Sequence, residues 1–287
     1  MSLDDRRETL SPMLAFCLLP AMYLLKAQAD NYLLFCLGAV LSLLPEGVLL
    51  VMIHSAFGKK GETPAVIKTP LLIIIGIFFG TMSVFTVLKF ARINEYFSQQ
   101  YIGSTLVIAL VLLSGLYIAS LSDGAAERLC SAVLLITLSM YIITVLMAVK
   151  NGDVSNLHIS SASPFDDVKG GFFAGALIFE PDIWFWLLCL THKRGLRWGR
   201  FLALKGALLL LFTVPVVYVL GAHTRFSRLP SYDLSAYSKS VIIERFNGLF
   251  MMLITLSAII KTALEMHALR RCAEALLIRK AALNEKA

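Results

Sequence analysis

Charged side chains are scarce in this chain of 287 residues, where Asp, Glu, Lys and Arg together make up 16%. Soluble domains carry about 25% charged residues. This shortage, with 58% hydrophobic residues and a mean hydropathy of +0.77, excludes an ordinary soluble enzyme and a disordered chain. The net charge of +7 could suggest nucleic acid, but in so apolar a chain it is more typical of loops that face anionic lipid. We therefore expect an integral membrane protein that binds no nucleic acid.

Cysteine pairs and catalytic signatures are also missing. The cysteines show neither the CxxC spacing nor the histidine partners of a metal or redox site. The GxSxG, HExxH and P-loop patterns of familiar catalytic sites are absent as well. We expect no metal, no cofactor and no enzymatic activity, and we expect the cysteines to be buried, reduced and used for packing. They are Cys17, Cys36, Cys130, Cys189 and Cys272.

Eight apolar segments, separated by short polar connections, approach or reach the length needed to cross a bilayer. They predict an all-α polytopic membrane protein with about eight transmembrane helices. A tail (residues 1–10) precedes the membrane domain (residues 11–266), and a basic amphipathic cytoplasmic helix (residues 267–287) follows it. The segments are Ser11–Ala29, Tyr32–His54, Pro70–Ile93, Ser104–Leu121, Glu127–Val149, Phe172–Leu190, Phe201–Ala222 and Ile243–Met266.

Basic residues gather at alternate ends of these segments. The Lys and Arg residues gather in residues 59–68, 193–200 and 270–280, and the N-terminal tail has Arg6 and Arg7; the other connections have fewer. By the positive-inside rule, both termini are cytoplasmic. A cleaved signal peptide ending at Ala27-Gln28-Ala29 is an alternative, but the acids before the first segment count against it.

An acid and a proline lie side by side at Glu180-Pro181, near the centre of the sixth segment. A charge at membrane depth costs about 2.5–3.5 kcal/mol on insertion scales, and proline removes a backbone donor. Broken helices of this kind bind solutes in many transporters. We expect a break at Phe179–Asp182, with Glu180 facing a cavity beside Pro20 of the first segment. The alternative is a kinked structural helix whose Glu180 is protonated or paired.

Other charges interrupt the second and eighth segments. Glu46 follows Pro45, and it is expected either to pair with a basic group or to line the same cavity. Lys261 and Glu265 lie four residues apart, and we expect them to reach the cytoplasmic interface by snorkelling.

Motifs spread over most of the chain resemble, in the right order, those of the GerAB-type spore-germination permeases. Glu244, Arg245 and Phe246, followed by Lys261, resemble the start and end of that family's eighth helix. Gly175–Glu180 resembles the phenylalanine-glycine-glutamate break of its sixth helix. Three further stretches resemble the family: Pro164–Gly171, Gly124–Arg128, and Pro20 with Asp30–Tyr32.

This resemblance implies the amino acid–polyamine–organocation superfamily, with a five-plus-five inverted repeat and discontinuous first and sixth helices around a midplane ligand site. It implies ligand contacts from the first and sixth helices and buried structural charges elsewhere. The implied ligand residues are Leu19, Pro20, Ala21, Gly175, Ala176, Phe179, Glu180 and Pro181. The implied structural charges are Glu46, Glu244, Arg245 and Lys261.

Family members serve as B subunits of germinant receptors, beside A-type and C-type subunits. The resemblance therefore implies a multi-pass protein of the spore inner membrane that recognises a small germinant, such as an amino acid. The family has ten helices and this sequence has eight segments, which predicts a truncated permease-like bundle and favours sensing over transport. A secondary amino-acid permease is the alternative, and a scaffold without a ligand is the third candidate.

Overall fold

The computed structural model describes residues 10–26, 29–53, 55, 65–97, 104–159, 161–191, 198–227, 229–238 and 247–284. Within this part of the chain every regular element is a helix, which confirms the all-α expectation. The elements are α1 (Leu10–Tyr23), η1 (Leu24–Lys26), α2 (Tyr32–Leu41), α3 (Leu43–Ile53), α4 (Ala65–Phe97), α5 (Ser104–Ser120), α6 (Asp123–Val149), η3 (Val154–Leu157), α7 (Pro164–Thr191), α8 (Trp198–Leu220), η4 (Gly221–Phe226), α9 (Pro230–Ala236) and α10 (Asn247–Asn284).

Five helical stretches are long and apolar enough to cross a membrane. Two shorter apolar helices, Leu10–Tyr23 and Thr105–Ser120, accompany them. These helices make the chain a multi-pass membrane protein, while the number of spans and their sidedness remain predictions. The five stretches are Tyr32–Ile53, Thr69–Glu95, Gly124–Val149, Trp198–Phe226 and Gly248–Ile278.

The helices predicted to be broken are continuous, so this expectation was wrong. α1 runs through Pro20 to Tyr23, and α7 runs from Pro164 to Thr191, through the predicted break at Phe179–Asp182. An internal proline removes one hydrogen bond and costs about 3 kcal/mol. A full break would leave several backbone groups unpaired among apolar side chains, and each of those is also costly.

The second segment is instead the interrupted one. It divides into α2 and α3 at Ser42, whose hydroxyl donates a hydrogen bond to the carbonyl oxygen of Ala39 at 2.6 Å. Ser42 lies three residues before Pro45, a position where the local backbone must already adjust to the missing amide of the proline.

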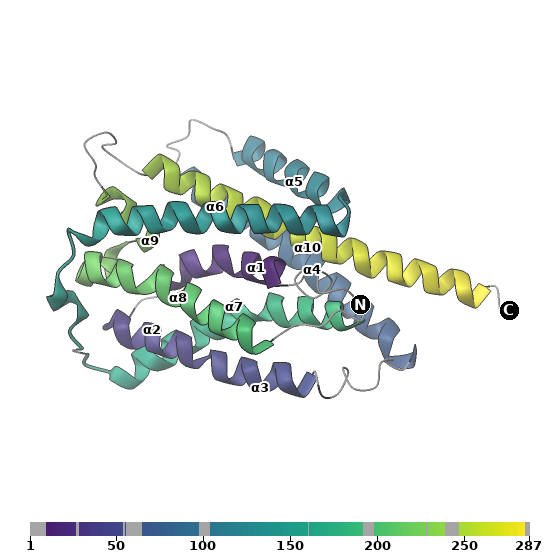
Figure 1. Ribbon diagram of the computed structural model, residues 1–287, viewed down its shortest axis with the longest axis horizontal. Helices are drawn as coiled ribbons and strands as arrows, with labels where there is room; N and C mark the ends of the chain where they lie inside the picture. The colour runs from purple at the N-terminus through teal and green to yellow at the C-terminus, as the bar shows by residue number, and fades with distance from the viewer. Residues whose placement is uncertain are drawn as a thin grey trace.

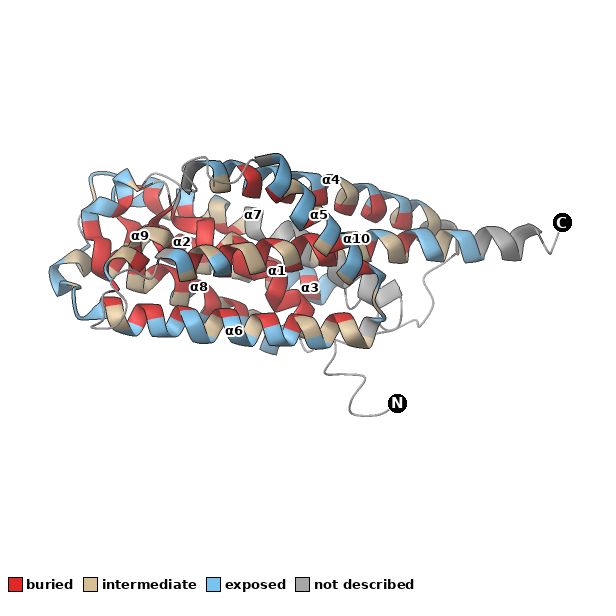
Figure 2. Ribbon diagram, turned by 90° about the horizontal axis from the view of Figure 1, so that it is seen from above, coloured by how far each residue is buried: buried red, intermediate tan, exposed pale blue. Residues whose placement is uncertain are grey.

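α1 lies at the centre of the bundle, in contact with α6, α7, α8, α9 and α10. Its residues from Pro12 to Tyr23 are buried, except for the partly exposed Pro20. A helix that is apolar on all sides is buried either in protein or in lipid, and α1 is buried among its neighbouring helices. Figure 2 shows this buried core, with exposed faces on the outward sides of α5 and α6.

The connections gather at two ends of the bundle (Figure 1). We call the end that holds residues 29–31, 150–159 and 221–238 the outer end, after its predicted side of the membrane. The opposite, inner end holds Ser122, Trp198 and the last turns of α10. α10 continues without interruption through Met266, where the membrane domain was expected to end, and its final turns extend beyond the bundle.

Candidate functional site

The predicted ligand residues on α1 lie in the core of the bundle. Leu19 and Ala21 are buried, and Pro20 is partly exposed. α7 contacts α1, so the two helices that carry the predicted ligand residues are neighbours. The side chains of Phe179, Glu180 and Pro181 lie outside the described part of the chain, and the orientation of Glu180 therefore remains a prediction.

Gly175 lies against α2, a helix that the predicted site did not include. A Cβ atom added at Gly175 would meet the Ser42 hydroxyl and the backbone of Ala39. Its neighbour Ala176 is partly buried and packs against the apolar core. Gly175 is therefore needed at this position for close helix packing, whatever contact it makes with a ligand.

Two further glycines continue this close contact between α2 and α7. A Cβ atom at Gly171 would meet the backbone of Phe35, and one at Gly38 would meet the carbonyl of Val168. Membrane helices approach closely where small residues recur four apart. Gly171 and Gly175 have this spacing, a sequence signal from which the contact could have been predicted.

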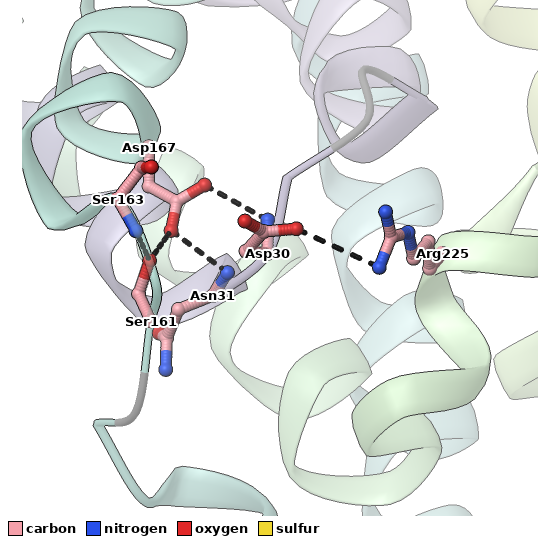
Figure 3. A network of polar contacts seen from close by, with 6 residues as sticks. All are labelled: Asp30, Asn31, Ser161, Ser163, Asp167 and Arg225. Atoms are coloured by element: carbon pink, nitrogen blue, oxygen red, sulfur yellow. Dashed lines mark hydrogen bonds and ion pairs between the residues drawn. The ribbon is translucent and has the colours of Figure 1, made fainter.

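Asp167 joins the same two helices at the outer end, as Figure 3 shows. Its carboxylate accepts hydrogen bonds from the backbone N–H groups of Asp30 at 2.8 Å and Asn31 at 2.9 Å. The Ser161 hydroxyl donates a third bond at 2.6 Å. Asp30 also approaches Arg225, which follows α8, at 3.5 Å, but both side chains are largely exposed, so this pair adds little stability.

Asn31 fixes the start of α2. Its side-chain oxygen accepts hydrogen bonds from the backbone N–H groups of Leu33 and Leu34, and its side-chain amide donates to the carbonyl of His158. These bonds satisfy amides that have no partner inside the helix. Together with Asp167 and the glycine contacts, they hold α2 and α7 as one paired unit.

Glu46 is paired with a base, one of the two roles expected for it. Lys205 of α8 donates a hydrogen bond to its Oε1 atom at 3.1 Å, and both side chains have no exposed surface. The ring of Phe201 lies 5.5 Å from the Lys205 Nζ atom. The sequence analysis missed Lys205, although a lysine within the apolar run that starts at Phe201 was a visible signal.

Lys261 and Glu265 are buried inside the bundle, so the expectation that they reach the interface was wrong. Their exposed fractions are 6% and 0%, and the Nζ and Oε1 atoms lie 4.0 Å apart. Thr86 of α4 donates a hydrogen bond to the same Oε1 atom at 3.0 Å. The apolar part of α10 extends to Ile278, well past the expected end of the segment, and this places the pair at its middle. Glu244 and Arg245 lie outside the described residues.

Four of the cysteines are buried thiols, as expected, and Cys189 lies among the side chains that the structure does not describe. Over the described ranges, no group of three or more His, Cys, Asp or Glu side chains could hold a metal ion.

No family model, curated protein or solved structure matches this chain. The arguments for function therefore rest on the chain's own residues.

Proposed function

We propose that this protein is a membrane subunit of a germinant-receptor-like complex, and that it recognises a small solute such as an amino acid through α1 and α7. The proposal rests on contacts between the first and sixth, the second and seventh, and the third and eighth spans, counted along the chain. In an inverted repeat of five plus five helices, each span of the first half corresponds to the span five places later in the chain. We call two such spans counterparts, and counterparts that lie near the symmetry axis pack against each other.

The first three spans and their counterparts follow this arrangement. α1 contacts α7, the pair α2 and α3 contacts α8, and α4 contacts α10. Two buried polar links join counterparts as well. Glu46 of α3 meets Lys205 of α8, and Thr86 of α4 meets Glu265 of α10. This agreement between packing and polar pairing supports a permease-like bundle around α1.

The continuity of α1 and α7 changes the form of recognition that we propose. In many transporters the exposed ends of half-helices bind the solute. In this protein we propose that side chains bind it instead. Glu180 is the acid of α7 within the predicted ligand segment, and a carboxylate fits the ammonium group of an amino acid. The basic inner end, including the continuation of α10, would face anionic lipid and the A-type and C-type partners in the spore inner membrane.

The test uses the native host and its spores. A strain without this gene should lose its germination response to at least one solute, and the parental gene should restore that response. Glu180→Gln should not restore it, whereas Asp166→Asn, an acid-to-amide change at an exposed site of the same helix, should. An equal response with both variants would overturn the role of Glu180.

Purification from the native membrane in mild detergent tests the complex. A-type and C-type subunits should co-elute with the chain and be identified by mass spectrometry. A lone chain that takes up an amino acid in liposomes would overturn the receptor proposal in favour of the permease. A lone chain with neither binding nor uptake would overturn both and leave a scaffold.

A further inference from the structure

The middle of α10 carries a buried carboxyl group that the proposed recognition of a solute does not use. Lys261 and Glu265 straddle the midpoint of the apolar stretch Gly248–Ile278. Glu265 has no exposed surface. Thr86, its partner on α4, also lies near the middle of an apolar stretch, Thr69–Glu95. The group therefore lies inside the bundle, toward its inner end, because His267 and Arg270 of the next turns already reach the carbonyls of Ala119 and Leu121.

The two oxygens of Glu265 differ in their surroundings. Oε1 accepts the hydrogen bond from Thr86 at 3.0 Å and lies 4.0 Å from the Lys261 Nζ atom. Oε2 is buried and has no hydrogen-bond partner among the described residues. Ser257 lies two turns before Glu265 on the same face of α10, and its buried hydroxyl also has no partner there.

An ionised carboxylate has about four acceptor positions, and this one fills one of them with a hydrogen bond. Lys261 is at the outer limit of an ion pair and approaches the oxygen that is already bonded. Leaving a charge so poorly compensated in an apolar interior is far more costly than leaving a neutral polar group unpaired. Protonation at Oε2 removes this charge and keeps the bond from Thr86. It also leaves the Lys261 ammonium without its nearby anion, so Lys261 lowers the affinity of Glu265 for the proton.

In the described part of the chain, the neighbouring helices carry few charged residues. α1 and α5 contain no charged residue. On α4, the described charged residues after Thr86 are Lys89, Arg92 and Glu95, which lie further toward the outer end. On α6, the charged residues lie in its first turns. On α10 itself, His267 and Arg270 reach toward carbonyls of α5 and the turn after it. α7 and α9 carry their described charges at the outer end, at Asp166, Asp167, Lys169 and Asp233.

We propose that Glu265 is a proton-binding site inside the bundle, and that Lys261 and Thr86 set its affinity for the proton. A hydronium ion supplies the proton that forms the O–H bond at Oε2 and is left as water. On release a water molecule takes the proton and becomes hydronium, and the carboxylate is again the anion facing Lys261. The site is separate from the proposed solute contacts on α1 and α7. It holds whether the chain senses a solute, transports one or does neither.

The test is pH-difference infrared spectroscopy on the full-length protein in lipid nanodiscs. A protonated carboxyl in an apolar environment gives a carbonyl stretching band that is distinct from that of a solvated carboxyl. The parent should show such a band, titrating with pH, and Glu265→Gln should abolish it. Glu274→Gln, which changes an exposed acid on the same helix, should leave the band unchanged. A band that survives in Glu265→Gln would overturn the proposal.

Two further variants keep the proposal testable if Glu265→Gln does not fold. Lys261→Met removes the nearby cation, so the band should persist to a higher pH than in the parent. Thr86→Val removes the bond to Oε1 and should shift the same transition in the same direction. Transitions identical to that of the parent in both variants would also overturn the proposal. These readouts need no solute, so they can fail or succeed independently of the germination experiments.

Discussion

Two buried carboxylates of the described residues have polar partners on another helix. Glu46 and Lys205 come from α3 and α8, and Glu265 receives its hydrogen bond from α4. Removing one member of a buried ion pair leaves the other charge without compensation. Replacing both members with apolar residues can be nearly neutral. The polar pairs therefore specify which helices pack together more than they stabilise the bundle.

A double-mutant cycle on Glu46 and Lys205 tests this conclusion. Glu46→Leu and Lys205→Met should each lower the free energy of unfolding by about 3–5 kcal/mol, because each leaves a buried charge unpaired. The double variant should be closer to the parent than either single variant. Glu274→Gln, which removes the exposed acid paired with Arg270 on α10, should have an effect below about 1 kcal/mol. Strictly additive effects at Glu46 and Lys205, measured by unfolding in detergent, would contradict the prediction.

Asp167 is the residue that we expect to matter most at the outer end. Asp167→Ala removes the acceptor of two backbone amides and the Ser161 hydroxyl. The cost should be about 1–3 kcal/mol, because these donors lose a charged acceptor. Asp166→Ala removes the exposed acid next to it and should change the unfolding midpoint much less. If the two variants unfolded alike, the network in Figure 3 would have no role in stability.

At the scale of elements, the contact between α2 and α7 is the tightest feature of the bundle. Gly171→Ala places a methyl group against the backbone of Phe35, so the two helices must separate. Overpacking of this kind costs about 1–3 kcal/mol. Gly248→Ala is the control, since nothing lies within 4 Å of a Cβ atom at that position. The prediction fails if thermal unfolding in detergent shows the same midpoint for both variants.

Hydropathy predicts the helices well where they are apolar throughout. The segments expected at Ser104–Leu121 and Glu127–Val149 match α5 and α6 to within a few residues. Hydropathy does not predict whether a helix continues through a proline, or how far an apolar helix continues into a polar stretch. Pro20 and Pro181 indicate a lost hydrogen bond but not whether the helix continues, which depends on the packing around it. The extension of α10 is polar enough to be mistaken for a separate element.

The site could be predicted less completely than the fold. Glu46 stood out as a charge in an apolar segment, but its partner lies 159 residues away in the sequence. Spacing along a helix predicts neighbours three or four residues apart and gives no information about contacts of this range. The same limit explains why Lys261 and Glu265 were recognised as a pair, while Thr86 on α4 was not.

At the scale of the whole molecule, the two ends differ in charge and in their connections. Arg200 lies in the first turn of α8 at the inner end, and the basic continuation of α10 extends from the same end. The acids Asp30, Asp166 and Asp167 lie at the outer end. Basic connections are retained on the cytoplasmic side during insertion. The fold and the positive-inside rule therefore predict the same sidedness for every connection.

Cysteine labelling in whole cells tests this sidedness. In a variant whose five native cysteines are replaced, Ser155→Cys and His223→Cys should react with a membrane-impermeant thiol reagent, because both sites are exposed at the outer end. Ser122→Cys and Gly199→Cys, exposed at the inner end, should react only after the cells are made permeable. A helix that connects a site labelled from outside to a site labelled only after permeabilisation must then cross the membrane. Labelling of Gly199→Cys in intact cells would contradict cytoplasmic termini, and equal labelling at both ends would contradict the spanning bundle itself.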